Sequence, residues 1–433
     1  MKRIGYVAAG AVIVALGLLA GCNQQTQGTS VKVHLRDDWG TPTAANVIYQ
    51  VGNGEWQLAA QDDFGEYSFT LPPGEKRYGV AVNCIPNLHG LRTLAFYTIY
   101  QLTSDDATEV TIPCFNFTNG PSVTTAKINW DASALSGNYF KVYTPVSVEE
   151  GSSSPIKLDS AVGDDQPFLF LAYDSNNDDY SGLVGVRYDK IDVGPEESIS
   201  VTMTSSDAAA FGSIEGPQTP NGFSDCGVRG AIYTHDGLQA IDLAEAGGNP
   251  CQGSFLKIPG LSANDDYIFL STYRDTGTDR ALAELSVLPA ANLDKYEMAD
   301  ELPSPWPANY SVQPAALPTF KLNHPDGGVA GYMISYFAQG GGPWWTIFIS
   351  PAWLDGNDEY TIPDMTSIPG FGGARPLSDE VVEWEVFALF SDTPLGEVLN
   401  SPHWTVAGGP VWIPVPSGLH MTGASKAGAY PVP

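Results

Sequence analysis

The chain has 433 residues and is strongly acidic, with 49 Asp and Glu against 20 Lys and Arg and a formal net charge of −29. Such a chain repels phosphate backbones, and its sequence holds no Lys/Arg cluster to offset this locally, so nucleic-acid binding is disfavoured. Hydrophobic residues make up 43% and aromatic residues 11%, which is enough to build cores and excludes a disordered stalk. The length predicts several domains.

The chain begins with the design of an export signal. Lys2 and Arg3 precede an uncharged apolar run over 4–20, which ends in small residues. A basic start, an apolar middle and a small-residue end are typical of a cleaved signal peptide. A membrane helix is the alternative, but the run lies at the lower limit of the length that spans a bilayer. We therefore predict a signal peptide over 1–21 and a polar tether over 22–30.

The end of this leader reads Leu19-Ala20-Gly21-Cys22 and resembles the lipobox of bacterial lipoproteins. The resemblance implies cleavage before Cys22 and attachment of lipid to its sulfur, so that the partner of this end is a membrane. Each buried lipid methylene contributes about 0.8 kcal/mol to such anchoring. In enteric lipoproteins an Asp after the cysteine favours inner-membrane retention. Asn23 stands there instead, which implies an exported protein at the outer membrane or cell surface.

After the tether, short alternating runs broken by Gly, Pro, Asn and Asp predict an all-β chain. The first strands are expected over 31–35, 46–51, 55–59, 67–71 and 78–83. Their breaks contain DDWGTP, GNGE and PPGE, where Gly and Pro favour turns. A strand followed by D-x-x-G-x-P, with DDFGEYSFTLPPG and YGVAV downstream, resembles the carboxypeptidase-regulatory-like domain. The resemblance implies a small transthyretin-like β-sandwich and names no catalytic residue.

A strand unit then recurs along the chain. Four aromatic-led apolar strands begin at Tyr78, Phe168, Tyr267 and Trp384, each followed by a polar turn and a further strand. This repetition predicts tandem β-sandwich modules in the manner of immunoglobulin or fibronectin type III domains. The expected modules, and a loosely ordered tail after them, are 31–118, 119–205, 206–300, 308–415 and 416–433.

Four cysteines remain besides Cys22, and they allow three connectivities. Joining nearest neighbours keeps each bridge within one module, so we predict Cys84–Cys114 and Cys226–Cys251. These cysteines form no CxxC motif and stand near no His pair, so zinc and redox chemistry are not indicated.

The acidic stretch DSNNDDYSG is the one weak calcium candidate, through Asp174, Asn176 and Asp178. A calcium loop of the EF-hand type needs Gly at its sixth position and Glu at its twelfth. Asp179 and Gly185 stand there, so that motif fails. The same residues suit a hairpin turn, and no cofactor is predicted beyond this calcium alternative.

Tryptophans gather in the last third of the chain. Of ten tryptophans, seven lie beyond residue 300. Adjacent strand residues face opposite sides, so at most one of Trp344 and Trp345 enters the core. The pair is a candidate ligand platform for a sugar ring. The alternative is core and intermodule packing, the usual role of large aromatic side chains.

The sequence shows none of the common catalytic motifs considered next. The six histidines stand singly, and HExxH, GxSxG and Walker motifs are absent. We therefore expect a non-catalytic, lipid-anchored envelope protein whose modules bind an envelope protein or polysaccharide. The alternatives are a glycan-binding surface lipoprotein that uses exposed C-terminal tryptophans, and a secreted hydrolase with an unrecognised site.

Overall fold

The computed structural model describes residues 28–37, 41–84, 96–114, 123–175, 180–224, 226–275, 277–339, 342–401, 404–406, 412–414 and 416–433. Among these residues nearly all of the regular secondary structure is strand, which confirms the all-β prediction. The predicted signal peptide, Cys22 and most of the tether lie outside them. Within the described ranges no helix is long and apolar enough to cross a membrane.

The first sandwich packs two layers against each other. Val31, Val33 and Leu35 are buried between the layers, and the alternation along their strand turns Lys32 to the other side. The outer layer is a four-stranded sheet in which β1 pairs antiparallel with β5 and parallel with β8. In spatial order it contains β4 (Ala60–Asp63), β5 (Glu66–Leu71), β1 (Thr29–Arg36) and β8 (Glu109–Pro113). The facing layer contains β2 (Asn46–Val51), β3 (Gln57–Leu58), β6 (Arg77–Cys84) and β7 (Phe96–Thr103).

The second sandwich has two sheets of its own around the buried side chains of Ile128, Phe140 and Phe170. One sheet contains β12 (Ile156–Ala161), β9 (Val123–Asp131) and β15 (Ser198–Thr202). The other contains β11 (Val148–Gly151), β10 (Tyr139–Tyr143), β13 (Gly163–Tyr173) and β14 (Leu183–Val193). The 3-10 turns η1 (Ser133–Leu135), η2 (Tyr180–Gly182) and η3 (Ser205–Asp207) border these strands.

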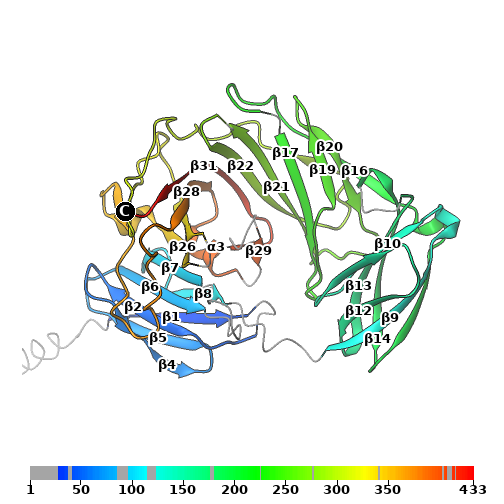
Figure 1. Ribbon diagram of the computed structural model, residues 1–433, viewed down its shortest axis with the longest axis horizontal. Coiled ribbons are helices and arrows are strands. Elements are labelled where there is room, and N and C mark those ends of the chain that lie inside the picture. The colour runs from blue at the N-terminus through cyan, green and yellow to red at the C-terminus, as the bar shows by residue number, and fades with distance from the viewer. Residues whose placement is uncertain are drawn as a thin grey trace, which may run out of the picture.

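The rest of the chain builds one continuous sheet that arches from the second sandwich to the first (Figure 1). This 16-stranded sheet ends in β7, β6, β2 and β3, so it includes a layer of the first sandwich. Its other strands, in spatial order, are β23 (Lys295–Glu297), β16 (Ala210–Glu215), β20 (Gln252–Lys257), β19 (Ala244–Gly247), β17 (Cys226–Tyr233), β21 (Asp266–Asp275), β22 (Arg280–Pro289), β31 (His420–Pro431), β28 (Val381–Ser391), β25 (Gly331–Ala338) and β26 (Trp344–Ile349), with β18 (Gln239–Ala240) beside β17.

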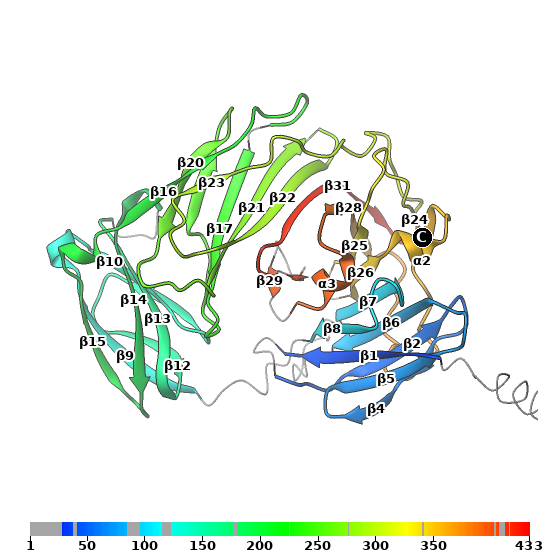
Figure 2. The same ribbon diagram turned by 180° about the vertical axis from the view of Figure 1, so that it is seen from behind.

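Pairing of β26 with β7 joins the C-terminal segment to the first sandwich. These strands run parallel, with residues 344–349 opposite 96–101. Figure 2 shows the joint from behind, where β26 lies next to β7. The sheet therefore crosses the predicted module limits, because an exposed strand edge in one segment is completed by a strand from another.

The remaining elements are short and flank this sheet. In the part of the chain that the structure describes, two helices are four and five residues long. Two further antiparallel strand pairs lie outside the large sheet. The bounds are α2 (Pro351–Leu354), α3 (Leu395–Leu399), β24 (Thr319–Lys321), β27 (Glu359–Thr361), β29 (Trp404–Val406) and β30 (Trp412–Pro414).

The expectation of a loosely ordered tail over 416–433 is wrong. Strand β31 runs antiparallel between β22 and β28. Its small residues misled the prediction, since they look like linker composition. A Cβ on Gly428 would lie 2.4 Å from the Trp384 ring, so glycine makes room for that indole. The Ala424 carbonyl accepts a hydrogen bond from Trp306 Nε1 at 2.9 Å. Small residues here serve close packing.

Candidate functional site

Both predicted disulfides are formed. Cys84 ends β6 and Cys114 follows β8, so this bridge ties the two layers of the first sandwich, with Cα atoms 5.1 Å apart. Both sulfur-bearing residues are buried. The sequence separation is 30 residues. Joining each cysteine to its nearest neighbour in the sequence was sufficient to predict this bridge.

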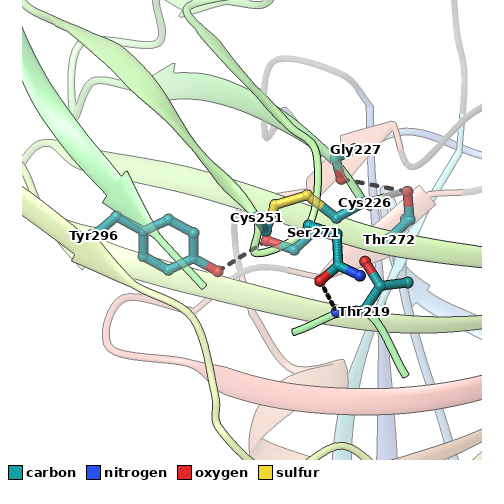
Figure 3. Close-up of a disulfide and its surroundings, with 8 residues drawn as sticks. Thr219, Cys226, Gly227, Cys251, Ser271, Thr272 and Tyr296 are labelled. Carbon is teal, nitrogen blue, oxygen red and sulfur yellow. Dashed lines mark hydrogen bonds between the residues drawn. A yellow bond between two sulfur atoms is a disulfide. The ribbon is translucent and has the colours of Figure 1, made fainter. Parts of the chain in front are cut away.

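The second bridge joins Cys226, the first residue of β17, to Cys251, which directly precedes β20 (Figure 3). Around it, Ser271 Oγ and Tyr296 Oη are 3.1 Å apart, and Thr272 Oγ1 donates to the Gly227 carbonyl at 3.4 Å. In the stretch GFSDCG over 222–227, Cys226 therefore has a structural role as one half of this disulfide.

The predicted platform at Trp344 and Trp345 is wrong, although the two side chains do alternate. Trp345 is fully buried and stacks on Tyr97 with ring centroids 4.4 Å apart. Trp344 is partly buried on the other face, where it stacks on Phe337 at 4.6 Å. The unforeseen strand pairing with β7 supplies Tyr97 and closes the site. Of the C-terminal tryptophan side chains that the structure describes, none is exposed; they are Trp306, Trp344, Trp345, Trp353 and Trp384.

Of the three residues of the calcium candidate, the structure describes Asp174. Asp174 lies just after β13, and its backbone N–H donates to the Gly182 carbonyl at 2.8 Å, as in a hairpin turn. Asn176 and Asp178 lie outside the described residues. Across the described ranges no group of three or more His, Cys, Asp or Glu side chains is arranged to hold a metal ion. The calcium alternative stays a prediction.

Three of the described histidines contact carboxylates: His34, His235 and His420. His420 Nε2 lies 3.3 Å from Glu284 Oε1, and Ser286 donates to the same oxygen at 3.0 Å. The serine is thus bonded to the acid instead of to the histidine, unlike a nucleophile paired with its base. His235 contacts Asp265 at 2.9 Å. Burial pushes the pKa of Asp265 up, but hydrogen bonds from His235 and Ser262 outweigh it and hold the pKa below its ordinary value.

A groove of about 520 Å³ follows one face of the large sheet. Its apolar lining includes Met333, Phe348 and Leu389. Its polar lining includes Glu385 and Arg274. Burial raises the pKa of Glu385, and hydrogen bonding to Ser425 and the charge of Arg274 offset the rise in part. The groove can take an apolar molecule, but its walls belong to the same core that joins the first sandwich to the C-terminal strands.

A second cavity, the junction pocket, lies between the first sandwich and the segment α2–β27. It has a volume of about 510 Å³ and is lined largely by polar side chains, together with two indoles. The first sandwich supplies Trp56 and Gln101, and the C-terminal segment supplies Trp353 and Asn357. Sequence reasoning missed this site because its halves are far apart in the chain. One signal in the sequence was the likeness of YQVGNGEWQ over 49–57, which contains Trp56, to YFAQGGGPWWT over 336–346.

Local structure fixes the C-terminal wall of the junction pocket. Ser350 caps α2 by accepting a hydrogen bond from the Trp353 backbone N–H at 3.1 Å. The same hydroxyl donates to Asp106 Oδ2 at 2.7 Å, and the Ser350 N–H donates to the Gln101 carbonyl at 2.9 Å. Because Asp106 and Gln101 belong to the first sandwich, the cap also holds the two walls together.

Comparison with known proteins gives only distant similarity. The Bacillus anthracis TIE protein is 11% identical over 64% of this chain, with a TM-score of 0.15, and this chain spans about half (51%) of its length. The shaft pilin SpaA from Lactobacillus rhamnosus GG is 10% identical, with 41% of this chain and 97% of the pilin covered and a TM-score of 0.14. A Streptococcal ancillary pilin is 7% identical, with 56% and 89% covered and a TM-score of 0.14. No family model and no curated protein matches the chain.

Proposed function

We propose that this is a lipid-anchored, non-catalytic binding protein of the cell envelope, located at the outer membrane or cell surface. The observation that carries the proposal is the continuous sheet, which unites the first sandwich and the C-terminal segment as a single body. Such a body suits display of a fixed surface, and the two disulfides suit an oxidising compartment. The large acidic charge favours solubility of an exposed surface.

The position of the predicted anchor supports the same proposal. Strand β1 begins at Thr29, seven positions after Cys22. The lipid would therefore hold the first sandwich close to the membrane. A polar tether of this length leaves the modules in water while the acyl chains insert.

Radiolabelled palmitate and membrane fractionation of the Cys22→Ser variant test the anchor. We expect loss of the label and release of the protein from the membrane fraction. A variant that still carries the label would overturn the lipid assignment.

Crosslinking in intact cells tests the binding role. Recovery of a defined envelope protein or polysaccharide supports it. Turnover of an ester, peptide or glycan substrate by the purified chain would instead show a hydrolase, and an empty crosslinking result with the wild-type protein would contradict the binding role.

A further inference from the structure

We infer that the junction pocket is a binding site for a neutral carbohydrate. This inference rests on the proposed binding function and names a ligand for it. Its size, about 510 Å³, lies within the range of small-molecule sites. A sugar ring has an apolar C–H face and a rim of hydroxyl groups, so a matching pocket needs aromatic surface beside amide and carboxylate groups.

The aromatic surface is present on both walls. Trp56 is partly buried, and its ring lies over Gly79, where a Cβ would approach the indole to 2.7 Å. Glycine is thus required for this ring position. On the opposite wall Trp353 is also partly buried and packs edge-to-face on Tyr360, with centroids 5.9 Å apart. Packing therefore orients both indoles before any ligand arrives, which lowers the entropy cost of binding.

Amide side chains supply the hydrogen-bonding groups of the junction pocket. Gln50 Nε2 donates to the Gly54 carbonyl at 2.6 Å, which fixes this side chain at the pocket wall. Gln101 is 2% exposed, and its side chain lies beside the Tyr360 hydroxyl. The amides of Gln50, Asn53 and Asn357 line the pocket. Each amide carries a donor and an acceptor, which suits hydroxyl groups, since these both donate and accept.

The charges in the pocket favour a neutral ligand. Arg77 lies 3.7 Å from Glu75 and 3.7 Å from Asp355, so its charge is balanced by carboxylates of this chain. Glu359 adds a further carboxylate to the lining. An anionic sugar would meet these carboxylates and the net charge of −29. A neutral hexose unit carries no charge, so these carboxylates do not repel it.

The first test uses the full chain carrying Cys22→Ser and a glycan array that includes neutral and acidic oligosaccharides. Titration calorimetry then measures the best neutral ligand with cellohexaose and maltohexaose as defined probes. We expect binding to neutral glycans alone. Binding restricted to acidic glycans, or to peptides offered in parallel, or no binding to any of these probes, would overturn the inference. Because the lipid-free chain is used, each of these results leaves the anchoring question untouched.

Variants then place the ligand. Trp353→Ala should weaken binding by about tenfold or more, which corresponds to about 1.4 kcal/mol. Asn357→Ala removes a lining amide together with its two hydrogen bonds to the Glu359 backbone, at 3.1 and 3.2 Å, so it should weaken binding and lower the melting temperature only slightly. Trp344→Ala, another partly buried indole outside the pocket, is the matched control and should retain affinity. Unchanged affinity in both Trp353→Ala and Asn357→Ala would show that the sugar binds elsewhere.

Discussion

The first and second sandwiches have similar layers but are joined to the rest of the molecule differently. In the first, the edge strand β7 is extended by the backbone of β26. The second keeps its two sheets separate from the large sheet and contacts the neighbouring segment by single hydrogen bonds. Tyr143 Oη donates to the Ile241 carbonyl at 3.2 Å, and the Ala209 N–H donates to the Val184 carbonyl at 3.0 Å. Backbone pairing along the edge of β7 thus makes the first sandwich part of a larger sheet. The second sandwich, whose described strands pair with no named strand of another segment, is a distinct unit.

The largest losses of stability should come from buried side chains at the β7–β26 joint and in the core of the second sandwich. Trp345→Ala should lower the free energy of unfolding by about 4 kcal/mol and reduce hydrogen-exchange protection in both β7 and β28. Phe168→Ala in the second sandwich should cost a similar amount yet leave protection in β7 unchanged. If Trp345→Ala affected β26 alone, the first sandwich and the C-terminal strands would not unfold together.

The disulfides should matter slightly less. Replacing both Cys84 and Cys114 by Ser frees a loop with a separation of 30 residues and should cost about 3.5 kcal/mol in the chain-entropy estimate. Replacing Cys226 and Cys251 should cost about as much, since their separation is 25. Denaturant unfolding under oxidising conditions measures both, and wild-type midpoints in the first double variant would contradict a tie between layers.

The contact between the second sandwich and its neighbour should be weak. Tyr143→Phe removes one hydrogen bond to Ile241 and should cost about 1 kcal/mol. Tyr49→Phe is the control, because its hydroxyl donates to Gln57 at 3.3 Å in an exposed position. Thermal unfolding compares the two. A loss above about 3 kcal/mol for Tyr143→Phe would show that this joint is as strong as the strand-paired one.

The continuous sheet should also respond to pH through Glu385. Burial raises its pKa in the folded state above the ordinary value of 4.5. The folded state therefore holds the proton more tightly than the unfolded state. Stability from this group is present below the unfolded pKa and is lost as the pH rises through the folded pKa. Glu385→Gln should raise the melting temperature at pH 8, with a difference that shrinks towards pH 4. A lower melting temperature at pH 8 would contradict this sign.

Much of the local structure could be predicted, and the long-range pairing could not. Alternation and turn residues placed the strand over 46–51 where β2 forms, and proximity along the chain paired the cysteines. The joint between β7 and β26 depends on which open edges meet, and short-range patterns do not encode that choice. The same gap hid the junction pocket, since Trp56 and Trp353 become neighbours only through this joint.

The bridge from Cys84 to Cys114 has a mechanical consequence. A tensile load that peels β1 from the first sandwich would draw out the chain only as far as Cys84. With the disulfide closed, the 30 residues of the loop add no contour length, a saving of about 100 Å at full extension. Reduction of this single bond would therefore lengthen the unravelled module by that amount, a difference that single-molecule stretching can resolve.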